Sequence, residues 1–178
     1  MTAIIVYGSL LNQAQLCRAT RLSSSAIPVF VKGYRRLFNQ EPSWRKGDNK
    51  HRAVLNIIRS EKDDFNGLLV RVRADSDFHQ LDERERGYDR IEVSYSQLES
   101  LMATPSLIES GPIYTYRGKP EKQNDDILPN ASYLELCLRG AQSWGEESWG
   151  EDFYEQFLQT TYVGRLPLKA FLQENLSC

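Results

Sequence analysis

Cysteine and histidine are scarce in this sequence, which has three cysteines and two histidines among 178 residues. Cys17, Cys137 and Cys178 lie far apart and form no Cys-x-x-Cys pair, and neither His51 nor His79 adjoins a cysteine. A disulfide framework and a zinc site built from cysteine and histidine ligands are therefore not expected.

Long apolar runs are also absent. No run approaches the roughly 18 residues that a membrane helix requires, and residues 1–11 lack the basic start and the small-residue cleavage site of a secretion signal. We therefore expect a cytoplasmic protein with no membrane partner. Hydrophobic residues make up 40% of the chain and charged residues 26%, so the composition is that of an ordinary globular protein rather than a disordered one.

Three common catalytic or nucleotide-binding motifs are missing as well. The phosphate-loop pattern that ends in Gly-Lys-Ser/Thr is absent, and no Gly-x-Gly-x-x-Gly follows a predicted strand. The Gly-x-Ser-x-Gly turn that presents the nucleophile of many hydrolases is absent too. The sequence therefore favours neither nucleotide binding nor serine hydrolysis.

The small net charge of −2 is unevenly distributed. Residues 1–60 contain ten lysines and arginines against two acidic residues, which gives +8, so the remainder carries −10. Such a region can attract a carboxylate-bearing metabolite or a nucleic acid, but it has no pattern of a known nucleic-acid reader. We expect a solvated basic face and no nucleic-acid partner.

The order of apolar runs and turn residues predicts one mixed α+β domain. Residues 3–7 predict a buried first strand that ends at Gly8-Ser9. The remaining predicted strands cover residues 27–34, 53–58, 68–72, 91–95 and 112–116, and the predicted helices cover residues 11–20, 78–86, 134–141, 153–158 and 166–175. Residues 38–50 predict a long surface loop, and Asn66-Gly67 is typical of a hairpin turn.

The last third contains a short tandem repeat, in which residues 143–147 are nearly repeated by residues 148–152. We interpret it as a duplicated loop and helix start. Its tryptophans, Trp144 and Trp149, belong either to a lid over the ligand pocket or to an inert surface loop, and indole rings are also ordinary core components. Cys137 falls on the apolar stripe of the preceding helix and is predicted to be a core residue rather than a nucleophile.

Glu85 is the most unusual residue of the predicted helix 78–86. Phe78 and Leu81 define the buried face of that helix, and Glu85 falls on the same face. An unpaired carboxylate there would have its pKa raised by desolvation, which suits a general acid or base. The alternative is a structural ion pair with Arg52 or Arg84, or a contact with a tyrosine.

The turn Tyr7-Gly8-Ser9-Leu10 joins the first predicted strand to a helix. Backbone N–H groups at such a turn can hold an anion, and the glycine lets a ligand approach closely. The same arrangement is also how many chains simply change direction.

In four segments the sequence resembles the γ-glutamylcyclotransferase-like superfamily, and these segments follow the family's order across residues 3–162. They are VYGSL at 6–10, GYRRLFN at 33–39, LDERE at 81–85 followed by GY at 87–88 and IEV at 91–93, and Tyr133 ahead of Cys137 and Gly140-Ala141. The Leu-Asp-x-Arg-Glu form is closest to the glutathione-specific, ChaC-like branch and to bacterial stand-alone members.

This resemblance implies a small mixed β-barrel flanked by helices, formed as a single domain over residues 1–178, with the ligand at the mouth of the barrel. It also implies conversion of a γ-glutamyl amide to 5-oxoproline with release of the amine, and no metal or organic cofactor. Glu85 would be the catalytic acid/base. The substrate-binding residues would be Val6, Tyr7, Gly8, Ser9, Leu10, Tyr88 and Tyr133.

The expected small-molecule partner is therefore a γ-glutamyl substrate: glutathione, a γ-glutamyl amino acid or a γ-glutamyl-amine. The choice among them is open at this stage, and so is the oligomeric state. The alternative function is a module on the same fold that binds a γ-glutamyl or related carboxylate ligand without turning it over.

Overall fold

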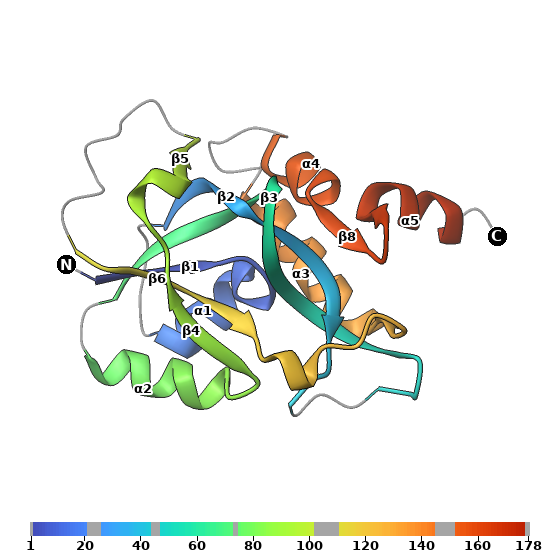
Figure 1. Ribbon diagram of the computed structural model, residues 1–178, viewed down its shortest axis with the longest axis horizontal. Coiled ribbons are helices and arrows are strands. Elements are labelled where there is room, and N and C mark those ends of the chain that lie inside the picture. Colours follow the sequence, from blue (N-terminus) through green and yellow to red (C-terminus); the bar gives the residue numbers. More distant parts are fainter. Residues whose placement is uncertain are drawn as a thin grey trace.

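Two long antiparallel strands form the centre of a large mixed sheet (Figure 1). The computed structural model describes residues 2–20, 26–43, 47–72, 75–101, 111–144 and 152–176. β2 (Ala26–Gln40) pairs with β3 (His51–Val72) over most of its length. The register between them shifts near Gly33, whose φ of 86° places a left-handed residue in the strand.

The first strand lies between two others. β1 (Thr2–Val6) pairs antiparallel with the second half of β3 and parallel with β6 (Ile113–Gly118). β4 (Tyr88–Glu92) forms the edge beyond β6. β1 is therefore an internal strand of the sheet, and its apolar residues Ile4, Ile5 and Val6 are all buried.

Short strands complete the sheet. β8 (Thr161–Val163) pairs parallel with β2, and β9 (Leu166–Pro167) pairs with β8, while β5 (Leu98–Ser100) lies on β2 and β7 (Leu128–Pro129) on β3. The predicted α+β class is confirmed. The mixed sheet predicted as a small β-barrel does not close in the part of the chain that the structure describes, because its end strands β4 and β9 do not pair with each other.

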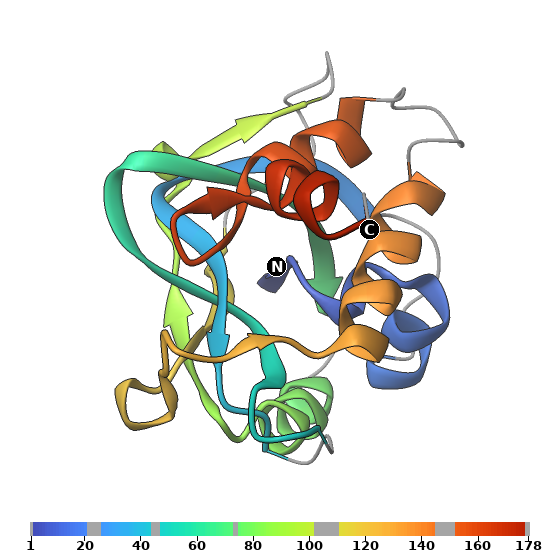
Figure 2. The same cartoon turned by 90° about the vertical axis from the view of Figure 1, so that its right-hand side faces the viewer.

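Helices cover the sheet on one side and at its ends (Figure 2). The long helices are α1 (Gln13–Thr20), α2 (Asp75–Arg84), α3 (Ala131–Trp144), α4 (Asp152–Gln159) and α5 (Leu168–Leu176), and the short 3₁₀ helices are η1 (Ser9–Leu11), η2 (Tyr95–Gln97) and η4 (Pro120–Lys122). None of the described helices is long and apolar enough to cross a membrane. As predicted, Phe78 and Leu81 of α2 are buried, and Cys137 of α3 is fully buried.

The hairpin predicted at Asn66-Gly67 is wrong, because both residues lie inside β3 and pair with Phe30 and Val29. β2 ends at Gln40 and β3 begins at His51, so β2 continues through the first residues of the loop predicted at 38–50. Gly67 allows the neighbouring strand to pack closely here and does not form a turn. A Cβ at Gly67 would lie 2.9 Å from the carbonyl oxygen of Val6 in the neighbouring strand.

Two further element boundaries differ from the prediction. The strand predicted at residues 91–95 begins earlier, at Tyr88, and ends at Glu92, because this segment pairs with β6 in register from Gly118 to Tyr114. The helix predicted from residue 166 begins at Leu168, because residues 166 and 167 pair with β8.

Trp144 is a core residue at the end of α3 and not part of a lid. Its side chain is buried, and its indole Nε1 donates a hydrogen bond of 2.6 Å to the backbone oxygen of Leu11. Trp149, with the rest of residues 145–151, lies outside the described residues.

Candidate active site

All eight residues that the sequence assigned to a site line one pocket. It lies where β1 leads into η1, beside the end of α2 and the first turn of α3, and it holds about 350 Å³ of empty space including its open mouth. Its lining residues are Ile5, Val6, Tyr7, Gly8, Ser9, Leu10, Leu55, Glu85, Tyr88, Tyr116 and Tyr133. Sequence reasoning missed Ile5, Leu55 and Tyr116, and the signal for Tyr116 exists only in the pairing of β6 with β1.

The loop after β1 turns sharply at the pocket. Leu11 N–H donates to the carbonyl of Gly8 at 2.9 Å, and Asn12 N–H donates to that of Ser9 at 3.2 Å. Gly8 also permits a close approach from α3, because a Cβ at this position would lie 2.7 Å from the hydroxyl oxygen of Tyr133. The glycine is therefore required by the packing of Tyr133 across the pocket.

Glu85 is placed by the end of α2. Its N–H still donates to the carbonyl of Leu81 at 2.8 Å, as in a helix, and its own carbonyl accepts from Tyr88 N–H at 2.8 Å as the chain turns into β4. Its side chain is 19% exposed, and its Oε1 lies 3.1 Å from Arg84 Nε. Of the two alternatives weighed from the sequence, the structure has the ion pair with Arg84, and the paired carboxylate still lines the pocket.

Three phenols around Glu85 donate hydrogen bonds away from it. Tyr7 donates to the carbonyl of Tyr116 and Tyr88 to that of Leu55, both at 2.6 Å, while Tyr116 donates to Asp82 Oδ1 at 2.7 Å. Burial is the largest cause that raises the pKa of Tyr7 and of Tyr88 well above 10, and the nearby charge of Glu85 raises both further. Burial and the hydrogen bond to Asp82 raise the pKa of Tyr116. These phenols are therefore neutral at physiological pH.

Arg36 supports the loop from inside the protein. Its fully buried guanidinium donates to the carbonyls of Asn66 and Tyr7 from Nη1, at 2.6 and 3.4 Å, and to Asn66 Oδ1 from Nη2, at 2.8 Å. Its Nε donates to Thr161 Oγ1 at 2.7 Å, and the group lies 4.2 Å from the ring centroid of Phe157. Burial lowers the pKa of Arg36 to about 9. Arg36 is thus an exception to the solvated basic face expected for residues 1–60.

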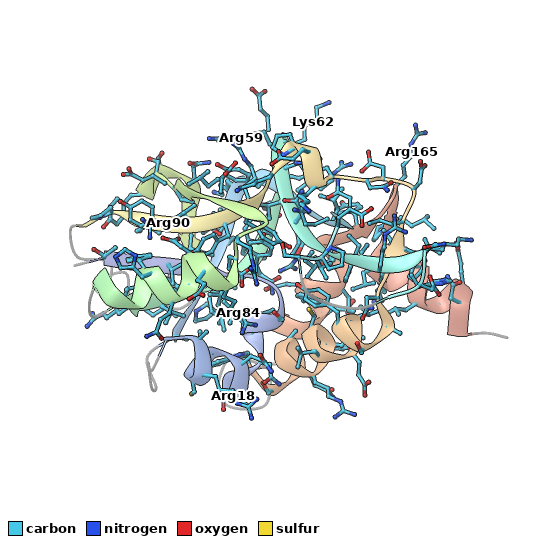
Figure 3. All side chains as sticks on the ribbon, turned by 90° about the horizontal axis from the view of Figure 1, so that it is seen from below. Arg18, Arg59, Lys62, Arg84, Arg90 and Arg165 are labelled. Carbon is cyan, nitrogen blue, oxygen red and sulfur yellow. The ribbon has the colours of Figure 1, made fainter. Side chains whose placement is uncertain are left out.

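Glu85 also lines a second, adjoining pocket. Ser9, Tyr88 and Tyr133 belong to both pockets, and the second adds Pro42, Ser43, Val54 and Arg84. Figure 3 shows Arg84 at the end of α2, on the side of α1. The carboxylate of Glu85 therefore stands at the junction of two small pockets. No group of three or more His, Cys, Asp or Glu side chains within the described ranges is arranged to hold a metal ion.

Comparison with known proteins finds the same fold. No protein-family model and no curated protein matches the sequence. A solved γ-glutamyl cyclotransferase superposes with a TM-score of 0.61 at 15% identity, over 97% of this chain and 98% of that one. A glutathione-specific γ-glutamyl cyclotransferase from yeast has a TM-score of 0.60 at 17% identity, over 92% of this chain and 96% of the other. YkqA from Bacillus subtilis has a TM-score of 0.65 at 18% identity, over 93% of this chain and 55% of its own.

The fold is therefore that of the γ-glutamyl cyclotransferase structures, as the sequence motifs led us to expect.

Proposed function

We propose that the protein is a γ-glutamyl cyclotransferase, which converts a γ-glutamyl amide to 5-oxoproline and releases the attached amine. One observation carries the proposal: Glu85 and the Tyr7–Leu10 loop come from separate segments of the chain and line the same pocket. The shared fold supports the class of enzyme.

The proposed reaction is an internal transfer of an acyl group. The α-amine of the γ-glutamyl group attacks its own γ-carbonyl carbon, which closes the five-membered ring, and the bond from that carbon to the leaving nitrogen breaks. One proton leaves the attacking nitrogen and one is added to the leaving nitrogen. Glu85 takes the first and supplies the second, so that a single carboxylate serves as base and then as acid.

The remaining pocket residues position the substrate. Because the attack is intramolecular, holding the γ-glutamyl chain folded contributes much of the acceleration. Backbone N–H groups of the loop at residues 8–10 bind the α-carboxylate or stabilise the oxyanion that develops on the γ-carbonyl. Tyr88 and Tyr133 enclose the γ-glutamyl group, and Arg84 holds the Glu85 carboxylate at the junction of the pockets.

The test is the release of 5-oxoproline from glutathione, γ-glutamyl-alanine and a γ-glutamyl-amine, measured by chromatography beside the released amine. We expect equal amounts of the two products from at least one substrate. If a folded protein binds these compounds in calorimetry but releases no 5-oxoproline from any of them, the protein is a binding module and the proposal fails.

A further inference from the structure

Glu85 and Tyr88 are the first and last residues of a tight turn between α2 and β4. The carbonyl of Glu85 accepts a hydrogen bond of 2.8 Å from Tyr88 N–H, which closes the turn. Both residues line both pockets. The backbone of this turn therefore sets where two residues of the proposed site lie relative to each other.

Gln40 reaches the turn from the end of β2. Its side chain is fully buried, and its Nε2 donates a hydrogen bond of 2.8 Å to the carbonyl of Gly87, inside the turn. The backbone N–H of Lys119, which follows β6, donates to the same carbonyl at 3.1 Å. Gln40 is not among the described residues that line the two pockets. Its influence on a bound substrate must therefore pass through the turn.

Stability does not account for an amide at position 40. Gln40 Oε1 is buried and has no hydrogen-bond partner among the residues that the structure describes. A buried carbonyl oxygen without a donor costs free energy. If Gln40 were replaced, the Gly87 carbonyl would keep its bond from Lys119, so an apolar side chain of the same size would fit at little cost. The hydrogen bond that the amide does make holds the turn that carries Glu85.

We propose that Gln40 is a positioning residue for the reaction: it holds the Gly87 carbonyl, and through the turn it fixes Glu85 beside the γ-glutamyl group. Glu85 must come within hydrogen-bond reach of the attacking nitrogen and then of the leaving nitrogen. A misplacement of about 1 Å can lower the rate by roughly a hundredfold. This inference rests on the proposed function and adds to it a residue that does not touch the substrate.

The test compares Gln40→Met with the wild type in 5-oxoproline release and in urea unfolding. Methionine has a similar length but donates no hydrogen bond. We expect kcat to fall by roughly tenfold or more, because the turn loses one of its two anchors. KM will change by less than about twofold and the urea midpoint will stay close to that of the wild type, because the substitution also removes the unsatisfied oxygen.

Gln40→Asn is the second variant. Its amide is one methylene shorter and does not reach the Gly87 carbonyl, so the same loss of kcat is expected. Gln123→Met is the matched control, because Gln123 Nε2 donates to the carbonyl of Gly118 at 3.1 Å. This substitution removes the same kind of bond from a carbonyl outside the turn, and its kcat stays at the wild-type value.

The outcomes separate this inference from the proposed function. If both Gln40 variants keep the wild-type kcat, or if Gln40→Met lowers only the urea midpoint, Gln40 is a structural residue and this inference fails while the proposed function stands. An equal fall of kcat in Gln123→Met also contradicts it. If the wild type releases no 5-oxoproline from any of the three substrates, the proposed function fails and this inference with it.

Discussion

Arg84 and Glu85 are consecutive residues whose side chains form an ion pair, with Arg84 Nε 3.1 Å from Glu85 Oε1. Neighbours in a continuous helix point about 100° apart. Here Arg84 is the last residue of α2 and Glu85 lies in the turn that follows. The end of the helix thus lets both side chains reach the junction of the two pockets. The ion pair fixes the direction of the carboxylate, and Glu85 still lines both pockets.

Gly8→Ala will destabilise the protein by about 2 kcal/mol, the usual cost of overpacking. The new Cβ would lie 2.7 Å from the Tyr133 hydroxyl, and the buried Tyr133 ring would have to shift. Urea unfolding measures the change. In a Tyr133→Phe background, which lacks that hydroxyl, the same substitution will cost less. An equal cost in both backgrounds contradicts the contact.

Asn66→Leu will lower the free energy of unfolding by about 3 kcal/mol, because it removes two buried hydrogen bonds, one of them from a charged group. Arg36 Nη2 loses its 2.8 Å bond to Asn66 Oδ1, and the carbonyl of Phe153 loses the 2.7 Å bond from Asn66 Nδ2. Urea unfolding again measures the effect. The exposed Asn175→Leu is the control, with an expected change within about 0.5 kcal/mol. Similar values for the two variants would show that the Arg36 network contributes little.

The protein will lose stability as the pH rises above about 10, the ordinary pKa of tyrosine. Burial raises the pKa of Tyr7 and Tyr88, so the folded state keeps phenolic protons that the unfolded chain releases. Stability falls wherever the folded state binds more protons. Arg36, with its pKa lowered to about 9, acts in the opposite direction with one proton. This gain in stability offsets the loss that comes from only one of the two tyrosines.

The phenolate absorbance near 295 nm checks this prediction. For Tyr7 and Tyr88 it will appear only together with the loss of circular dichroism, whereas in concentrated urea they will titrate near pH 10. Tyr7→Phe will reduce the rise in phenolate absorbance that accompanies unfolding. If the substitution instead reduces only the rise that occurs at lower pH, before the protein unfolds, Tyr7 is not buried as described.

Local patterns in the sequence predicted much of the position of Glu85. The spacing of Phe78, Leu81 and Glu85 predicted a carboxylate on the buried side of a helix; Phe78 and Leu81 are buried in α2, whereas Glu85 lies in the turn after it with its side chain 19% exposed. The strand that precedes Tyr7 was equally clear from its apolar run. Family motifs added Tyr88 and Tyr133, which line the same pocket.

Features that depend on distant parts of the chain could not be predicted. Tyr116 lines the pocket from β6, which pairs with β1, and Leu55 lines it from the first part of β3, which pairs with β2. Arg36 gave no signal of burial, since its acceptors come from three other segments, at residues 7, 66 and 157–161. Asn66-Gly67 has the composition of a turn, but tertiary packing overrode that preference. Asn66 binds Arg36, and Gly67 admits the backbone of β1.

The most direct test of the proposed mechanism is turnover by Glu85→Gln, measured as 5-oxoproline release from the best substrate of the wild type. Glu83→Gln is the control, because Glu83 is exposed on α2 and lines neither of the two pockets. The mechanism predicts that Glu85→Gln keeps its fold and its substrate affinity while kcat falls by at least about a hundredfold, the usual contribution of a general acid/base. Glu83→Gln keeps the wild-type rate. A folded Glu85→Gln protein that turns over at the wild-type rate would contradict the role of Glu85.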